Sequence, residues 1–149
     1  LKVFDIIGYG LMAYSPLQAK KHKFFLDDDI FVLNRDNLLV EAFKQISILK
    51  ESYFPPQKPS YFLSGHEVKE KMHQVLLDLE KKNIIFGYDV DIGLGLADVL
   101  SGGDTTKSDE VSEDDLYNLE RQSLINLIQS SKTRDRIHAM LSTGRRLKN

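Results

Sequence analysis

Residues 101–149 read S-G-G-D-T-T-K-S-D-E-V-S-E-D-D-L-Y-N-L-E-R-Q-S-L-I-N-L-I-Q-S-S-K-T-R-D-R-I-H-A-M-L-S-T-G-R-R-L-K-N, and this order decides the fold class. The Gly102-Gly103 pair ends a preceding helical pattern, because glycine readily adopts the left-handed conformation that follows helices. Ser112 is a good helix cap, and the acidic residues directly after it suit the positive end of the helix dipole. The apolar residues that follow lie along one side of a helix: Leu116, Leu119, Leu124, Leu127 and Ile128.

A last helix is expected in the same segment. Thr133 has the residue type of a cap, and Gly144 is placed to end the helix. Its apolar side consists of Ile137, Met140 and Leu141. The polar residues 104–111 predict a mobile loop before the previous helix, so the whole segment is helical apart from one loop and a basic tail.

Residues 13–54 contain two further helical patterns. Ser15 and Pro16 predict the start of a short helix that ends near His22, since proline has no amide to leave unpaired at a first helical position. Residues 34–36 begin the second helix, and the Pro55-Pro56 pair stops it. Its spacing predicts a single buried face made of Leu39, Ala42, Phe43, Ile46 and Leu49.

Two longer helices follow. Ser64 and Glu67 have the spacing of a capping box, and the helix that they begin ends near Asn83. Another helix spans about residues 88–100. The apolar residues 1–12 resemble a truncated buried helix rather than a signal peptide, because they lack a basic start and include Asp5.

One strand-like run is present, Ile30-Phe31-Val32-Leu33. A short strand needs a partner, either Phe24-Phe25-Leu26 in a hairpin or a strand outside this chain. The sequence therefore predicts an all-α fold with about six helices and one short strand or hairpin near residues 24–33. Residues 55–63, rich in proline, predict a connector between residues 1–54 and residues 64–149.

The composition excludes several classes of function. The chain has 149 residues, a net charge of -2 and no cysteine. This charge does not favour nucleic-acid binding, and the lack of cysteine excludes disulfides and thiolate metal sites. No apolar run approaches the ~20 residues of a membrane span, so we expect none. The lack of cysteine is compatible with the cytoplasm, where we expect the protein to be.

No group of residues has the pattern of a catalytic or metal site. His66 and His73 are seven residues apart on one predicted helix, hence ~10 Å apart along its axis, too far to share a metal ion. Gly93 and Gly95 lack the third glycine of a dinucleotide loop and lie within a helical pattern. We interpret them as packing glycines that let another helix approach. The sequence predicts no catalytic residue and no metal ligand.

The basic tail has two interpretations. Its cations are Arg134, Arg136, Arg145, Arg146 and Lys148. Guanidinium groups are suited to phosphate, so the tail could bind an anion. Alternatively, it is a solvated helix end in which basic residues favour the negative end of the helix dipole.

Four features in this order and spacing resemble a known family. They are V-L-S-G-G-D at 99–104, L-E-R at 119–121, R-I-x-x-M-L-x-x-G-R at 136–145 and L-K-N at 147–149. With N-R-D at 34–36, Y-x-P-P at 53–56 and A-K at 19–20, they resemble the C-terminus of bacterial multidomain 3-hydroxyacyl-CoA dehydrogenases of fatty-acid β-oxidation. In that family an NAD-binding dehydrogenase part precedes an enoyl-CoA hydratase-like part of crotonase fold.

The resemblance implies that residues 1–54 are the truncated C-terminal part of the crotonase-like domain. Residues 64–149 would be a helical C-terminal extension with the terminal helices. The dehydrogenase part, the crotonase core, the NAD site and the catalytic groups of the parent would then lie upstream, so this segment binds no NAD and holds no catalytic residue. Leu1 lies inside an apolar run, which also suggests a piece of a longer protein.

The resemblance also implies contacts for the tail. The last crotonase helix typically offers an aromatic and a basic residue to the nucleotide of coenzyme A. Met140 stands in the aromatic place and Arg146 where a proline is more usual. Arg145, Arg146 and Lys148 are the candidate contacts to the CoA phosphates, and the parent is expected to bind acyl-CoA.

Two hypotheses follow for the chain itself. The first is an inactive structural and assembly segment of the parent enzyme, with its exposed faces favouring homo-oligomers. The second is a stand-alone helical module that binds other proteins without catalysis.

Overall fold

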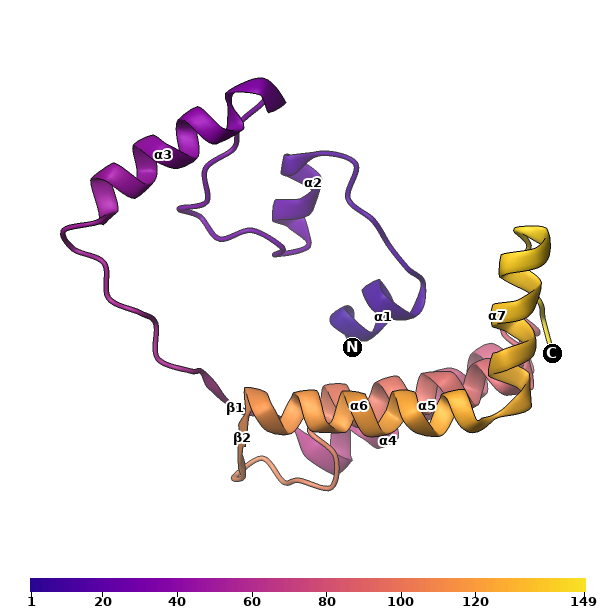
Figure 1. Cartoon of the computed structure of the whole chain (residues 1–149). Helices are drawn as coiled ribbons and strands as arrows, with labels where there is room; N and C mark the ends of the chain where they lie inside the picture. The colour runs from indigo at the N-terminus through magenta and orange to yellow at the C-terminus, as the bar shows by residue number, and fades with distance from the viewer. The chain divides into compact units, whose positions relative to one another are not determined.

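The chain is built mainly of helices, as the sequence predicts (Figure 1). The computed structural model describes all residues from Leu1 to Asn149. It contains seven α-helices, one short 3-10 helix and one two-stranded sheet. In chain order they are α1 (Lys2–Gly8), α2 (Pro16–Lys21), η1 (Arg35–Asn37), α3 (Leu38–Leu49), β1 (Ser60–Phe62), α4 (Gly65–Lys81), α5 (Gly87–Ser101), β2 (Glu110–Ser112), α6 (Glu113–Gln129) and α7 (Ser131–Thr143).

These elements form two units. The larger unit combines Leu1–Gly10 with Lys58–Asn149, and the smaller unit is Leu11–Gln57. The chain passes from the smaller to the larger unit within the proline-rich residues 55–63. None of the helices is both long and apolar enough to cross a membrane.

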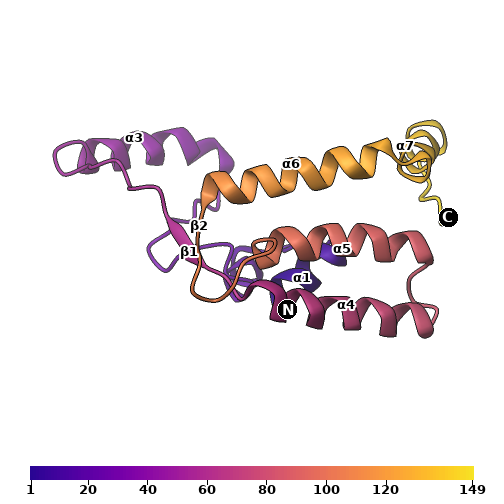
Figure 2. The ribbon, with the colours of Figure 1, turned by 90° about the horizontal axis from the view of Figure 1, so that it is seen from below.

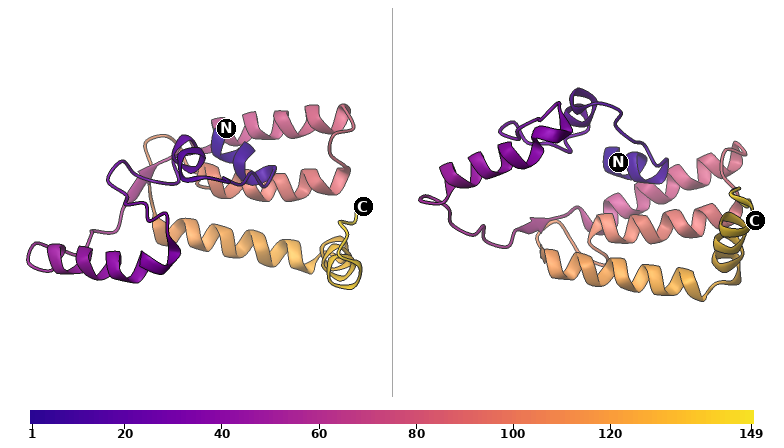
Figure 3. Two further views of the ribbon diagram at one scale, coloured as in Figure 1. Left: turned by 90° about the horizontal axis from the view of Figure 1, so that it is seen from above. Right: turned by 45° about the horizontal axis from the view of Figure 1, so that its top comes forward.

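Three helices lie side by side in the larger unit, with α5 between α4 and α6 (Figures 2 and 3). The short helix α1 packs on α5. The core consists of side chains from these elements, namely Phe4, Met72, Leu76, Val90 and Ala97. Phe4 is the contribution of α1, whose Ile6 is also buried while the other apolar residues of 1–12 are largely exposed. The helix expected to be buried over residues 1–12 therefore buries only Phe4 and Ile6.

Glycines in α5 allow its neighbours to approach closely, as the sequence indicates. A Cβ atom at Gly93 would lie 2.5 Å from Leu76 Cδ2 of α4, and one at Gly95 would lie 2.5 Å from Ser123 Oγ of α6. Each of these distances is too short for real carbon contacts. The two glycines therefore face opposite neighbours of α5, and both are packing residues.

Several predicted helix ends are confirmed. The Ser15 hydroxyl accepts a hydrogen bond from Gln18 N–H at 3.2 Å, and the Ser112 hydroxyl accepts one from Asp115 N–H at 3.1 Å. Gly102 and Gly144 end their helices with φ of 85° and 67°. The Asn34 side chain accepts from Asp36 N–H and begins η1, which leads into α3.

Two predicted caps are wrong. The Ser64 side chain makes no capping hydrogen bond; the donor His66 N–H at this helix start instead binds the carbonyl oxygen of Thr105, at 3.2 Å. Thr133 lies inside α7, which begins after Ser130. At α4 this tertiary hydrogen bond replaces the local cap, because it satisfies the same backbone group. At α7 the residue before the helix is Ser130, whose side chain makes no capping hydrogen bond.

The strand prediction is also wrong. Residues 24–33 contain no strand, and the sheet instead pairs β1 with β2 in antiparallel register, with Tyr61 opposite Val111. Residues 110–111 therefore belong to a strand rather than to the loop predicted over 104–111. Val111 is buried beside Gly102. The pairing of β1 with β2 is therefore stabilised by apolar burial as well as by backbone hydrogen bonds.

The loop before β2 is tied to the start of α4. The Glu67 carboxylate pairs with Lys71 Nζ at 2.8 Å and with Lys107 of the loop. Hydrogen bonds from these two ammonium groups, Lys107 first, and their positive charges lower the pKa of Glu67 to about 2.

The smaller unit buries very little. Ala19 is its only buried residue. The predicted buried face of α3 is exposed, with Leu39 at 71% and Phe43 at 68% exposure. The helix and its apolar periodicity are as expected, but nothing within the unit packs against this face, so the prediction of burial is wrong.

The contact of Gly93 with Leu76 predicts a sharp effect of substitution. Gly93→Val should lower the free energy of unfolding by about 1–3 kcal/mol, because the added methyl groups overpack the core at Leu76. Gly8→Val is the matched control, since a Cβ atom at Gly8 meets nothing within 4 Å. Urea denaturation of both variants measures the difference. Equal stability of the two variants would contradict the packing role.

Candidate functional site

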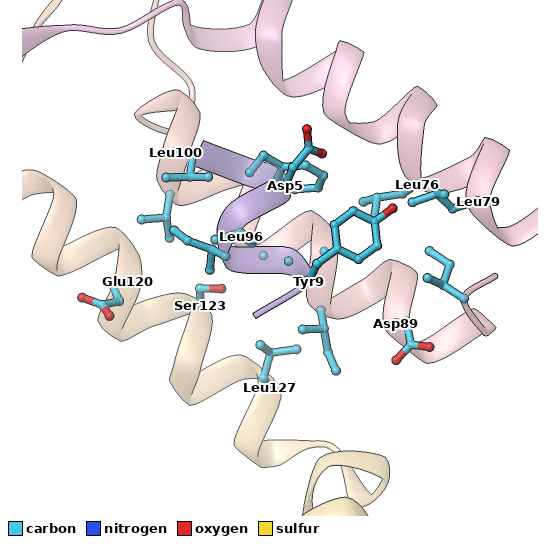
Figure 4. A pocket seen from close by; sticks show the side chains of 18 of the residues that line it. Asp5, Tyr9, Leu76, Leu79, Asp89, Leu96, Leu100, Glu120, Ser123 and Leu127 are labelled. Carbon is cyan, nitrogen blue, oxygen red and sulfur yellow. The ribbon is translucent and has the colours of Figure 1, made fainter. Parts of the chain in front are cut away.

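The main cavity of the larger unit is a groove between α1, α5 and α6, with a contribution from α4 (Figure 4). Its volume is about 750 Å³. The side chains from α5 and α6 that line it are mainly apolar: Ile92, Leu96, Val99, Leu100, Leu124 and Leu127. Tyr9 lines it from the end of α1. A surface of this kind suits an apolar guest.

The charged side chains that line the groove are all negative. Asp5, Asp89 and Glu120 line it, and no lysine or arginine does. Asp5 and Glu120 make no ion pair within the chain. We define this cavity with its carboxylates as the acidic groove.

The acidic groove lacks the arrangement that catalysis by a hydroxyl requires. Ser123 is its only serine, and none of the four histidines lines it. Nucleophilic catalysis needs a base within hydrogen-bond reach of the hydroxyl. The mainly apolar lining of the groove therefore favours binding of an apolar guest.

A second polar cluster joins the start of α5 to α7. The Asp89 carboxylate accepts hydrogen bonds from Phe86 N–H at 2.9 Å and from Arg136 Nη1 at 2.6 Å. Arg136 Nε also donates to Asn149 Oδ1 at 2.7 Å. Arg136 thus fastens both α7 and the tail to one carboxylate.

The pKa of Asp89 reflects this arrangement. Burial raises the pKa of this carboxyl, but the hydrogen bonds from Phe86 N–H and Arg136 and the positive charges of Arg136 and Lys148 outweigh burial. The pKa of Asp89 consequently lies below its ordinary value of 3.8. The carboxylate is charged at neutral pH and able to hold the guanidinium.

Tyr88 adds a second connection between α5 and α7. Its hydroxyl lies 2.6 Å from Thr133 Oγ1, and the residue is buried, with 4% exposure. Lys132 Nζ lies 5.3 Å and the Arg136 guanidinium carbon 5.1 Å from the ring centroid, within the range of cation–π attraction. The role of Thr133 is therefore to bind Tyr88 rather than to cap α7.

The basic side chains between positions 134 and 148 do not form a single site. Arg134 Nη1 donates to the carbonyl oxygens of Ile128 and Gln129 at the end of α6, at 3.1 and 2.7 Å. Lys148 Nζ lies 5.0 Å from the Phe86 ring centroid. Arg145 and Arg146 are exposed, and neither guanidinium group takes part in an ion pair or a hydrogen bond. Of the three candidate phosphate contacts, these two are free to reach a ligand.

Sequence reasoning missed Asp89 and Tyr88. Asp89 lies three residues after Phe86, at the position whose side chain can accept from the residue that precedes the helix. That spacing was a usable signal. The ion pair with Arg136 had no such signal in the sequence, because 47 residues separate the two side chains.

No histidine takes part in the acidic groove or in the hydrogen bonds of the Asp89 cluster. His73 Nδ1 is 3.9 Å from Glu70, and His66 begins α4. No group of three or more histidine, aspartate or glutamate side chains is arranged to hold a metal ion. In the run Asp27-Asp28-Asp29, Asp29 accepts from Leu26 N–H and closes a turn, and Asp27 pairs with Lys20 at 2.8 Å.

Comparison with known proteins identifies a distant relative of the chain. The chain is a distant homologue of a probable 3-hydroxyacyl-CoA dehydrogenase. This protein of Bacillus subtilis (strain 168) is 26% identical over 151 residues, an alignment that covers 100% of the chain. The chain spans 19% of the length of that relative. No protein-family model matches the chain, and no solved structure does.

The cluster at Asp89 predicts a specific pH dependence. Asp89→Asn should lower the free energy of unfolding at neutral pH by about 1–2 kcal/mol, since it removes charged hydrogen bonds. Because the folded-state pKa of Asp89 is depressed, its contribution is present above the ordinary pKa and is lost as the pH falls through the folded value.

Urea denaturation at pH 7 and at stepwise lower pH measures this difference. The gap between the native protein and Asp89→Asn should close below pH 3.8. Asp91→Asn, on the exposed side of α5, should behave as the native protein throughout. A gap that persists unchanged in acid would refute the electrostatic role.

Proposed function

We propose that the chain is the C-terminal structural and assembly portion of a 3-hydroxyacyl-CoA dehydrogenase. The parent oxidises 3-hydroxyacyl-CoA with NAD and carries an enoyl-CoA hydratase-like, crotonase-fold region, in the cytoplasmic β-oxidation of fatty acids. The observation that carries the proposal is the similarity along all of the chain to a probable enzyme of this type. The ordered motifs at residues 99–104, 119–121 and 136–149 add to it.

Within that parent, residues 1–54 belong to the crotonase-like domain, residues 55–63 are the connector, and residues 64–149 are the helical extension. The partners of the chain are the dehydrogenase part and the crotonase core of the same protein. The exposed apolar face of α3 supports this assignment, because a helix face with Leu39 and Phe43 in water favours a covering partner.

The NAD of the parent does not fit the residues of this chain. A dinucleotide loop needs glycines that bring the backbone to a pyrophosphate at a helix start. Gly93 and Gly95 instead lie inside α5 and face Leu76 and Ser123. The nicotinamide chemistry therefore belongs to the remainder of the parent, and this chain supplies packing surfaces.

The proposal predicts where activity resides. The complete protein should reduce NAD⁺ with 3-hydroxybutyryl-CoA and hydrate crotonyl-CoA, whereas the isolated 149-residue chain should do neither, because it lacks a catalytic constellation. Absorbance of NADH and of the enoyl thioester measures both reactions. Turnover by the isolated chain, or its absence from the complete protein, would overturn the assignment.

We further propose that Arg145, Arg146 and Lys148 contact the phosphates of coenzyme A. Replacing all three with alanine in the complete enzyme should raise KM for the acyl-CoA several-fold and leave KM for NAD unchanged, since guanidinium and ammonium groups bind phosphate by charged hydrogen bonds. Lys81→Ala with Lys82→Ala, at the end of α4, is the matched control. Unchanged acyl-CoA kinetics would remove this role.

The second candidate is a stand-alone helical module that binds proteins without catalysis. The exposed face of α3 is equally consistent with it. The encoding gene separates the two: an NAD-binding region encoded before Leu1 supports the enzyme segment, and a start codon directly before Leu1 supports the module.

A further inference from the structure

Helix α7 offers an apolar stripe to solvent. Its half-buried residues Thr133, Arg136 and Ala139 lie on one side, where Thr133 and Arg136 bind α5. Ile137, Met140 and Leu141 lie on another side and are exposed, Leu141 at 83%. Residues at positions i, i+3 and i+4 of a helix share one face, and this spacing is typical of a helix that binds in a groove.

The acidic groove matches this stripe in character. Its lining is apolar along α5 and α6, and α1 covers only part of it. Leu124, which lines it from α6, is more than half exposed. The lining residues Glu120 to Leu127 extend ~10 Å along α6 at 1.5 Å per residue, enough to accept the one helical turn from Ile137 to Leu141.

The charges of the two surfaces are opposite. Asp5 and Glu120 line the groove and are exposed. Arg145 and Arg146 follow Gly144 at the end of α7, and both are exposed. Complementary charges set the orientation of an interface and favour one partner over others.

The stripe is held outside the groove of its own molecule. A single residue, Ser130, joins α6 to α7, and the contacts of Tyr88 with Thr133 and of Asp89 with Arg136 keep α7 on the start of α5. Ile137, Met140 and Leu141 consequently remain in solvent. Another molecule is needed to cover them.

We propose that the acidic groove of one copy binds the α7 stripe of a second copy, and that two such reciprocal contacts close a dimer. Leu141 enters among the apolar residues of α5 and α6, and Arg145 and Arg146 face Asp5 and Glu120, so the dimer and coenzyme A compete for these two arginines. The occupant is this chain itself because it carries both complementary surfaces. The inference does not depend on the dehydrogenase assignment.

The test is sedimentation of the 149-residue chain over a range of concentrations. Leu141→Asp damages the stripe and Leu124→Arg damages the groove, and each should weaken dimerisation by at least about tenfold. Both positions are largely exposed, so folding should persist, which circular dichroism checks. Phe43→Asp on α3 is the control and should dimerise as the native chain does.

Mixing the two damaged variants gives the decisive measurement. An equimolar mixture retains one intact groove and one intact stripe per pair, so it should form a heterodimer that neither variant forms alone. Higher salt should weaken the dimer, because exposed charges are screened.

Three results would overturn the proposal. They are a native chain that stays monomeric at every concentration, a mixture that fails to associate, and loss of the dimer in Phe43→Asp with retention in Leu141→Asp. The last result would place self-association on α3. None of these outcomes bears on the catalytic test of the parent enzyme.

Discussion

The close approach of α4 and α6 to α5 is the constraint on which the larger unit depends. Leu76 occupies the space where Gly93 has no side chain, and Ser123 does the same at Gly95. A larger residue at either position would push a neighbouring helix away from the central one. The acidic groove exists because these helices lie side by side while the short helix α1 covers only part of them.

Polar contacts extend this arrangement beyond the apolar core. Asp89 satisfies the amide of Phe86 and binds Arg136, so one carboxylate both shapes the start of α5 and holds α7. A charged pair of this kind stabilises only with good geometry and further hydrogen bonds, which Asn149 provides to Arg136. Arg145 and Arg146 are thereby left at the surface, where a phosphate or a carboxylate can reach them.

Surface composition links the fold to the proposed role. The two carboxyls whose pKa values are lowered, Glu67 and Asp89, hold a loop and a helix end in place, and Asp89 also lines the acidic groove. The apolar residues of α3 and α7 instead lie in water. Exposed apolar faces of this kind support the assembly role that we propose for the chain.

Local signals in the sequence predicted most of the helices and their ends. Ser15, Ser112, Gly102 and Gly144 act through neighbours within a few residues, so their roles are visible without a fold. The packing role of Gly93 and Gly95 was also evident, since glycine inside a helix weakens it unless another element needs the space. Of the candidate site, the sequence identified the tail cations but not which of them are free.

Contacts between distant residues were decided only by the tertiary structure. Ser60 pairs with Ser112 across the sheet, Tyr88 binds Thr133, and Asp89 binds Arg136. The periodicity of α3 correctly predicted an apolar face, but the prediction that this face is buried was wrong. Amphipathicity shows that a helix has an apolar face, not that a partner covers it. Sequence determines local backbone preference through nearest neighbours, whereas burial and ion pairing depend on which segments meet in space.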